Sequence, residues 1–269
     1  MTGIRILFRL GCGLLAIALL PAVALAEQDD QELAKKSQNP LGTIISLPFE
    51  NNTSFSDGPE DAAVNVLNVK PVYPASLGSW NLINRGIVPL IYQGERFDGE
   101  GTESGLGDIT YQAFFSPATP SGVIWGIGPA LVFPTHTDDR LGTDKWSAGP
   151  AAVVLAKPGR WLFGGLVQHV WSYAGDDDED NVNFSLAQYF INYNFDDGWY
   201  FSSTPTITAN WAADSEDRWT IPFGVGFGRL VRFGTQPVDF KGQVFYNAEK
   251  PDGVSDMSLQ LQVKFLFPK

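Results

Sequence analysis

Six charged residues stand within, or at the ends of, stretches in which apolar and polar residues alternate. They are Lys70, Arg85, Lys241, Lys264, Asp108 and Asp239. We expect the four cations on the inner face of a wall, opposed only in part by Asp239 and by Asp108 near an outer mouth. Such a cationic ladder would favour anions or molecules that carry a carboxylate. The alternative is that these charges pair with acids across a filled, non-conducting interior.

Catalytic chemistry has few residues to draw on. The two histidines are His136, in "THTDDR", and His169, in "GGLVQHVWS". A lipase or acyltransferase would need a histidine beside a serine, and Ser172 falls on the opposite strand face from His169. We therefore predict that the protein is not an enzyme. We expect His169 to be an inward polar residue or a partner of Trp171 near the lipid interface.

Metal and cofactor sites are not predicted either. The run 176–180, "DDDED", could bind calcium through carboxylates, but it lacks the glycine-spaced order of a calcium loop. We interpret it as a solvated loop tip, with weak cation bridging to lipopolysaccharide as the alternative. The one cysteine, Cys12, lies in an apparent export leader, so zinc-thiolate and thiol chemistry are not expected. No phosphate loop or dinucleotide fingerprint occurs.

Alternating segments of about ten residues must position these side chains. In "MSLQLQVKFLFPK", at the end of the chain, the apolar residues fall on every second position, which indicates a strand with one apolar face. Its length suits a membrane-spanning strand better than a soluble one. We predict twelve strands, at residues 42–50, 62–74, 80–93, 108–116, 122–134, 146–157, 161–173, 182–194, 198–211, 218–231, 237–247 and 256–267.

The connections between these strands alternate in length and charge. One set is short, for example "PATPS" and "PGR", and the other is long and acidic, for example "GERFDGEGTESGLG" and "AGDDDEDN". Short turns at one end and long loops at the other are typical of an outer-membrane barrel with periplasmic turns and extracellular loops. A positive charge facing lipid is costly, so we expect the charged wall residues to point inward.

The eight tryptophans all fall near strand ends, four beside each kind of connection. Trp80, Trp125, Trp161 and Trp199 follow short turns, and Trp146, Trp171, Trp211 and Trp219 lie beside long loops. Aromatic girdles at both interfaces characterise barrels in lipid. A soluble β-sandwich, the alternative, would place some tryptophans at strand centres. In the strand 122–134, we expect small inward residues such as Gly126 and Gly128 to leave room in the lumen.

The beginning of the chain resembles export machinery. Residues 1–26 contain Arg5 and Arg9, an apolar stretch and a small-residue cleavage site, and we predict a signal peptide. Residues 27–41 would be a short, helical periplasmic lead-in, and residues 42–269 the barrel. Loss of the two leader arginines changes the net charge from −12 to −14, which argues against nucleic-acid binding. No other stretch is apolar enough for a membrane-spanning helix.

The sequence resembles a family of bacterial outer-membrane proteins described as channels or transporters of the phenol-degradation (MetA-pathway) type, some of them mislabelled as neuromedin U. The stretches that carry the resemblance are "LAKKSQNPLGTIISLPFENN", "SGLGDITYQAFFSP", "WGIGPALVFPT", "KWSAGPAAVVL", "HVWSYAGD" and "VKFLFPK". It covers nearly the whole mature chain. It implies an outer-membrane barrel with a transport role, and it carries over no catalytic residue.

The sequence therefore predicts an all-β protein, a closed antiparallel barrel of about twelve strands in the bacterial outer membrane. We expect passive transport of small solutes, with small anions and small aromatic compounds as the competing substrates. The expected partners are membrane lipid, lipopolysaccharide and a small solute, with no cofactor and no nucleic acid. The alternative function is a structural or adhesion barrel with a filled lumen. Whether residues 27–40 plug the pore is left open.

Overall fold

Alternation of apolar and polar residues produces strands along most of the chain. The computed structural model describes residues 30–120 and 122–268, so the predicted leader with Cys12 lies outside the described residues. The strands are β1 Ile45–Asp57, β2 Ala62–Val69, β3 Val72–Leu77, β4 Trp80–Gln93, β5 Glu103–Leu106, β6 Ile109–Pro117, β7 Val123–Phe133, β8 Lys145–Ala156, β9 Trp161–Gly175, β10 Asn183–Asn194, β11 Trp199–Ser203, β12 Thr206–Asn210, β13 Trp219–Phe233, β14 Gln236–Glu249 and β15 Met257–Phe267. A short 3-10 helix, η1, spans Asp139–Leu141.

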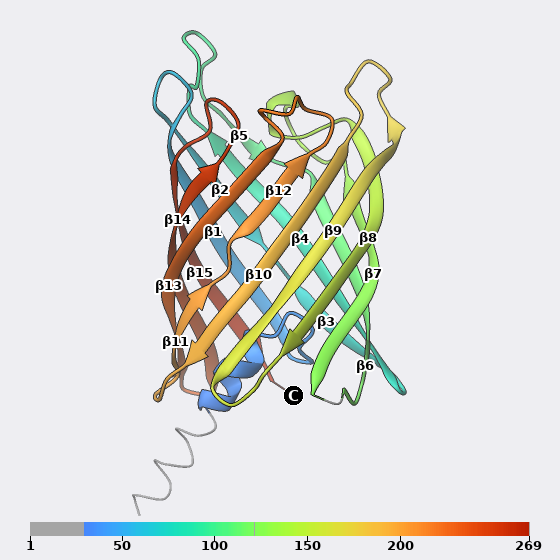
Figure 1. Ribbon diagram of the computed structural model, residues 1–269, viewed down its shortest axis with the longest axis vertical. Helices are drawn as coiled ribbons and strands as arrows, with labels where there is room; N and C mark the ends of the chain where they lie inside the picture. The colour runs from blue at the N-terminus through green and yellow to red at the C-terminus, as the bar shows by residue number, and fades with distance from the viewer. Residues whose placement is uncertain (1–29, 121, 269) are drawn as a thin grey trace, which may run out of the picture.

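The strands pair with their neighbours throughout and close on themselves (Figure 1). β15 pairs with β1 along its whole length, from Ile45 opposite Phe267 to Phe55 opposite Met257, and β9 pairs with β10. All of these pairings are antiparallel. The predicted fold class is therefore confirmed: the protein is a closed antiparallel β-barrel with twelve strand positions.

Fifteen segments fill the twelve positions because three positions are interrupted. Pro71 separates β2 from β3 and Pro205 separates β11 from β12, since proline has no N–H to give to a ladder. β5 and β6 both pair with β4, and Gly107 and Asp108 lie between them. The prediction that β5 belongs to a loop was therefore wrong.

The first strand is longer than predicted. It continues from Glu50 to Asp57 through "NNTSFS", which lies between the predicted strands 42–50 and 62–74. Asn51, Thr53 and Asn65 share one face of β1 and β2, and their side chains hydrogen-bond to one another at 2.6–3.0 Å. Because these polar groups satisfy each other, the strand continues where the apolar alternation ends.

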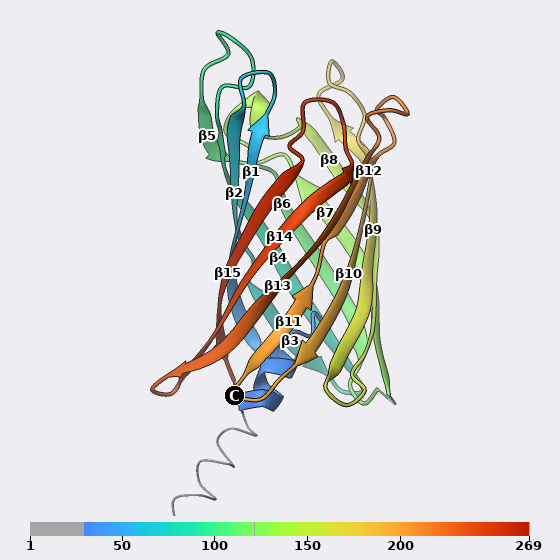
Figure 2. The same ribbon diagram turned by 60° about the vertical axis from the view of Figure 1, so that its left-hand side comes forward.

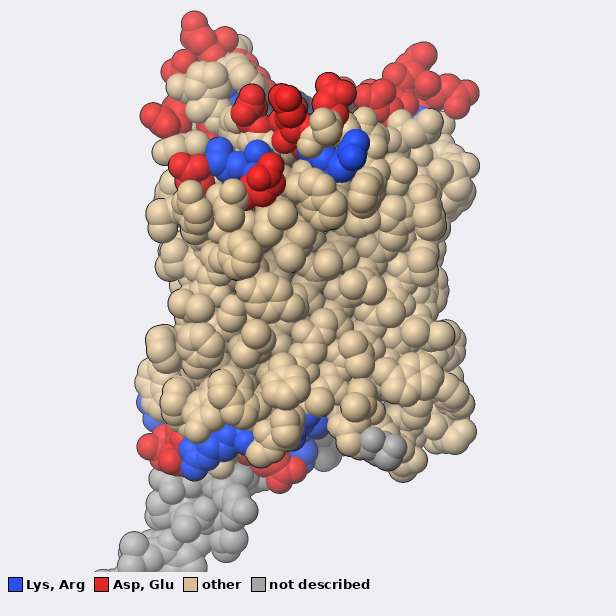
Figure 3. All heavy atoms as spheres, in the orientation of Figure 1, with Lys and Arg blue, Asp and Glu red and all other residues tan. Residues whose placement is uncertain are grey.

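The outer surface carries an apolar belt between two charged rims. Side chains of this belt are large and exposed, among them Ile127, Val154, Val225 and Phe227. On the face shown in Figure 3, charged residues gather at the two ends and are missing from the middle. No helix within the described part of the chain has the length and hydropathy needed to cross a bilayer. The belt is the surface expected where a barrel contacts lipid.

The N-terminal residues close the end of the barrel that carries the short turns. A helix over residues 30–37 lies in this mouth, as Figures 1 and 2 both show. We call residues 30–44 the plug segment. Leu33 and Ala34 are buried against Leu230 and Leu266 of the wall, and Leu41 inserts into a second apolar cluster.

The interior is divided into an apolar and a polar half. The apolar half is a packed cluster over β4 and β6 to β10, and it includes Ile83, Phe114, Leu166 and Phe190 together with Leu41. A Cβ placed on Gly126 would meet the Leu41 side chain at 3.1 Å. The space predicted beside the small residues of β7 is thus filled by the plug segment at Gly126.

Candidate functional site

The polar half of the lumen contains a partly open cavity of about 150 Å³ directly above the plug segment. Five of the six charged residues predicted to line a pore lie around it: Lys70, Arg85, Lys241, Lys264 and Asp239. They come from the strand positions next to β1, where the closure of the barrel brings the two ends of the chain together. The sixth residue, Asp108, is not among the cavity-lining residues.

Glu50, on β1, is a cavity residue that the sequence analysis missed. Its carboxylate forms an ion pair with Lys70, and it also interacts electrostatically with Lys241 and Arg85. Glu50 is the last residue of the predicted strand 42–50, so it was not included among the charges of the wall. The alternation along β1 could have identified it, because residues two apart share a face of a strand. Glu50 thus shares the inner face of β1 with Asn52, which accepts a hydrogen bond from Gln260.

Lys264 and Asp239 fasten the plug segment to the wall. The ammonium of Lys264 donates to the backbone oxygen of Ser37 at 2.9 Å and lies 3.7 Å from the Asp239 carboxylate. The hydroxyl of Ser37 donates to the same carboxylate at 3.2 Å, and Tyr200 donates to its other oxygen at 2.7 Å. Both charges are therefore occupied by partners. We call this set of contacts the latch.

Arg85 and Lys241 are left with fewer partners. Nη1 of Arg85 is buried and has no hydrogen-bond partner within the described chain. Lys241 donates to the hydroxyl of Thr204 at 3.3 Å. Thr204 faces the lumen at the break between β11 and β12, where its own N–H donates to the Gln243 side chain instead of to the ladder.

The cavity wall thus carries more positive than negative charge. Four cations, Lys70, Arg85, Lys241 and Lys264, face the two carboxylates of Glu50 and Asp239. One cation is paired directly with each carboxylate. Buried cations without a compensating charge are costly unless an anion joins them.

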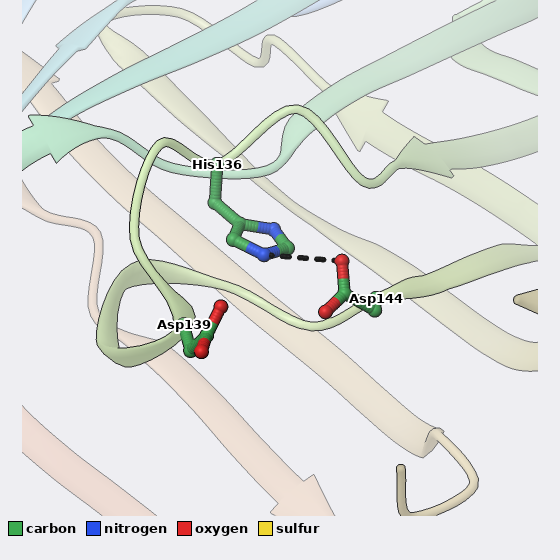
Figure 4. A group of neighbouring side chains, drawn as sticks. All are labelled: His136, Asp139 and Asp144. Atoms are coloured by element: carbon green, nitrogen blue, oxygen red, sulfur yellow. Dashed lines mark ion pairs between the residues drawn. The ribbon is translucent and has the colours of Figure 1, made fainter. Parts of the chain in front are cut away.

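Asp108 instead organises the outer loops. Its carboxylate accepts from the backbone of Thr143 at 2.7 Å and from Nδ1 of His136 at 2.8 Å. Nε2 of His136 lies 3.3 Å from Asp144, and Asp139 lies nearby (Figure 4). Burial opposes the charged form, but the hydrogen bond and charge of Asp108, with Asp144 and Asp139, raise the pKa of His136. These contacts place one histidine among three carboxylates at the outer mouth.

His169 faces the outside of the barrel, and the inward alternative was wrong. It shares a face with the exposed Val167 and Trp171, and its ring lies 4.1 Å from that of Trp171. Nδ1 of His169 lies 2.6 Å from the hydroxyl of Ser185 on the neighbouring strand, and Trp211 donates to the same hydroxyl at 2.8 Å. The spacing along one strand gave no signal for this pair, because only the β9–β10 register brings it together.

All eight tryptophans predicted for the girdles are exposed, with relative exposures of 36–49%. Rings pair at both ends: Trp80 of β4 packs edge-on against Trp125 of β7 at 5.9 Å, and Trp211 packs against Trp219 at 5.5 Å. This is the placement that interfacial tryptophans take in lipid-spanning barrels.

Known proteins share this architecture. A family profile described as "Putative MetA-pathway of phenol degradation" matches residues 46–263. The crystal structure of a COG4313 outer-membrane channel from Pseudomonas putida F1 is similar, with a TM-score of 0.66 at 19% identity over 83% of this chain and 94% of that one. The CymD monoaromatic hydrocarbon channel has a TM-score of 0.50 at 10% identity, over 87% of this chain and 92% of that one. The NanC porin has a TM-score of 0.50 at 11% identity, over 84% of this chain and 100% of that one. No curated protein matches the chain.

Proposed function

This chain belongs to the phenol-degradation MetA-pathway family, and from that premise we propose that it is a bacterial outer-membrane channel for the passive transport of small solutes. The observation that carries the proposal is the charged cavity inside a closed, lipid-facing barrel. A wall charge that served only stability would be expected to be fully paired. Nη1 of Arg85, in contrast, is buried without a partner in the described chain.

The plug segment is the gate in this proposal. The latch holds it across the periplasmic mouth, and Leu41 anchors it to the apolar half. The latch contacts are few and lie beside the cavity, so a rearrangement of residues 30–44 would open a path along the polar half. No catalytic step is needed for passage, and we propose no enzymatic activity.

The substrate proposal starts from two properties. The cavity wall combines cations with apolar side chains, among them Leu166, Phe190 and Val72. CymD, a protein of similar fold, is described as a monoaromatic hydrocarbon channel. Small anionic and small aromatic solutes are the two substrate classes that this lumen supports, and membrane lipid and lipopolysaccharide are the expected surroundings of the barrel.

A structural or adhesion barrel is the second candidate. The packed cluster in the apolar half favours it, because one half of the interior leaves little room for a solute. In that case the acidic outer loops would be the surface that binds ions or partners.

Liposome swelling tests the two candidates. Vesicles that contain the purified protein are placed in isosmotic solutions of a neutral sugar, a small organic anion and a small aromatic alcohol. The channel proposal predicts swelling above protein-free vesicles and a further increase when residues 30–40 are deleted. A protein that swells vesicles no faster than the protein-free control, with or without this deletion, would favour the structural barrel.

A further inference from the structure

We propose that the lumen cavity is a binding site for a small aromatic carboxylate, with Arg85 as the carboxylate-binding residue. The inference rests on the proposed channel function and narrows its substrate to one molecule type. It unites the anionic and aromatic substrate classes in one ligand.

The size of the cavity fits a single ring. Its volume of about 150 Å³ equals that of a protein cavity known to hold benzene, which is on the order of 150 Å³. Larger solutes would have to displace the plug segment or the packed half of the interior. The cavity therefore selects for one aromatic ring with a small substituent.

The charge of the cavity fits a carboxylate. Glu50 is engaged by Lys70, and Asp239 is engaged by Tyr200, Ser37 and Lys264. Both wall carboxylates therefore have their own partners.

Arg85 and Lys241 remain for a ligand. Nη1 of Arg85 is buried without a hydrogen-bond partner in the described residues, and the ammonium of Lys241 bonds only weakly to Thr204, at 3.3 Å. A guanidinium matches a carboxylate with two parallel hydrogen bonds, and an ammonium adds a point charge beside them.

The apolar wall lies next to the cation. Val72 stands directly opposite Arg85 in the β3–β4 register, and it packs against the cluster that contains Leu166 and Phe190. All three apolar side chains line the cavity. A carboxylate held at Arg85 would thus place its ring against Val72, Leu166 and Phe190, where an aliphatic acid such as acetate has nothing to bury.

Isothermal titration calorimetry of the full mature protein in detergent micelles tests this site. The probes are benzoate, its neutral analogue benzamide, and acetate, which lacks the ring. We expect benzoate to bind about tenfold more tightly than either of the others, because it alone uses both walls. Equal binding of benzoate and benzamide would refute the carboxylate site, and equal binding of benzoate and acetate would refute the ring pocket.

Substitutions test whether Arg85 is the residue that binds the carboxylate. Arg85→Gln should lower benzoate affinity about tenfold and leave benzamide unchanged, while Arg85→Lys should fall between, since a lysine keeps the charge but loses the planar fork. Lys241→Gln should lower benzoate affinity by a smaller factor. The matched control is Arg160→Gln, an exposed arginine of a short turn that pairs with Asp196. Wild-type affinity in the Arg85→Gln protein would overturn the assignment.

The readouts separate this proposal from the channel proposal. Heat-modifiable mobility on gels reports barrel folding, and if Arg85→Gln does not fold, Arg85→Lys and Lys241→Gln decide the question. A protein that swells liposomes but does not prefer benzoate refutes the site and leaves the channel. A protein that binds benzoate as expected but passes no solute supports the site and refutes the channel.

Discussion

His136 uses both of its ring nitrogens, one toward Asp108 and the other toward Asp144. Its side chain is nearly inaccessible, at 6% exposure. Both contacts are strongest when the imidazole is charged, which is why the pKa of His136 is raised despite its burial. The loop after β7 is thereby tied to the start of β6, at the outer mouth.

We predict that this loop is better ordered in acid than in base. The folded pKa of His136 lies above the ordinary value of about 6.5, so the charged contacts stabilise the loop fully below that pH. These charged contacts are lost as the pH rises through the pKa of His136 in the folded protein. Hydrogen-exchange protection factors of residues 134–144 should therefore be higher at about pH 6 than at about pH 9.

His136→Gln should abolish this pH dependence, because glutamine does not titrate in this range. The matched control is His169→Gln, which changes the outward histidine of β9 and should leave the dependence intact. A loop in the wild-type protein that is equally protected at both pH values would contradict the prediction.

Some cavity residues could be found from the sequence and others could not. Lys70, Arg85, Lys241 and Lys264 were placed on the inner face because a period of two assigns every residue of a regular strand to a side. Asp108 lies near the outer mouth, as expected, but its partners could not be found because they lie 27–35 residues away in a loop of irregular backbone. No periodic pattern reports such contacts.

In the proposed channel, the plug segment is the element whose position determines whether the lumen is open. Its helix spans residues 30–37, and it is held by hydrogen bonds at several points. Gln38 donates to Asn194 at 2.8 Å, and Lys35 bonds to the turn after β8. Lys264 supplies a charged contact from the opposite wall.

We predict that Lys264→Gln loosens the plug segment. The substitution removes the charge-assisted bond to Ser37 and leaves Asp239 without its cation. Ala34 is only 1% exposed, so a thiol introduced by Ala34→Cys should be protected. A water-soluble maleimide should react with that thiol about tenfold faster in the Lys264→Gln background.

Lys250→Gln is the control for this experiment, because Lys250 pairs with Asp256 in an outer loop. A thiol at position 34 that reacts at one rate in all backgrounds would show that the latch does not hold the segment.

The interruptions of the wall were also beyond sequence analysis. Pro205 lies inside a predicted strand, and proline there indicates a break, but nothing showed which groups would replace the ladder. In the structure, the hydroxyl of Ser203 donates to the backbone oxygen of Gly224 at 2.7 Å, and Gln243 accepts from Thr204. Side chains from β11 and β14 thus complete the hydrogen bonding of the break.

For the whole molecule, the apolar belt determines which substitutions the wall tolerates. Ile127 is 56% exposed in the middle of β7. We predict that Ile127→Lys costs about 2–4 kcal/mol of unfolding free energy in lipid vesicles, because its charge must enter the bilayer core. Leu77→Lys, at the end of β3 and 52% exposed, should cost only about 0–1 kcal/mol near the interface.

Urea unfolding of the two variants in vesicles, followed by tryptophan fluorescence, measures this difference. The two side chains have similar exposure, so depth in the bilayer is the main variable. Equal costs at the two positions would mean that the belt does not contact lipid.

At this scale the sequence predicted most of the fold. Alternation, loop asymmetry and the girdle tryptophans are repeated around the barrel, so local errors at one strand do not change the architecture. The filling of the lumen could not be predicted in this way. Leu41 lies far along the chain from Gly126, and no repeating sequence pattern reports their contact.

The latch has a consequence for assembly. Asp239 and Lys264 stand on β14 and β15, the last strands to emerge from the ribosome, whereas Ser37 stands near the start of the chain. A barrel that has not yet received its final hairpin lacks the latch and retains only the contacts of Gln38, Lys35 and Leu41 with earlier strands. We therefore expect an unfinished molecule to hold its N-terminal segment less firmly than a completed one. Periplasmic proteases would thus cleave this short segment more readily in molecules that have not finished folding.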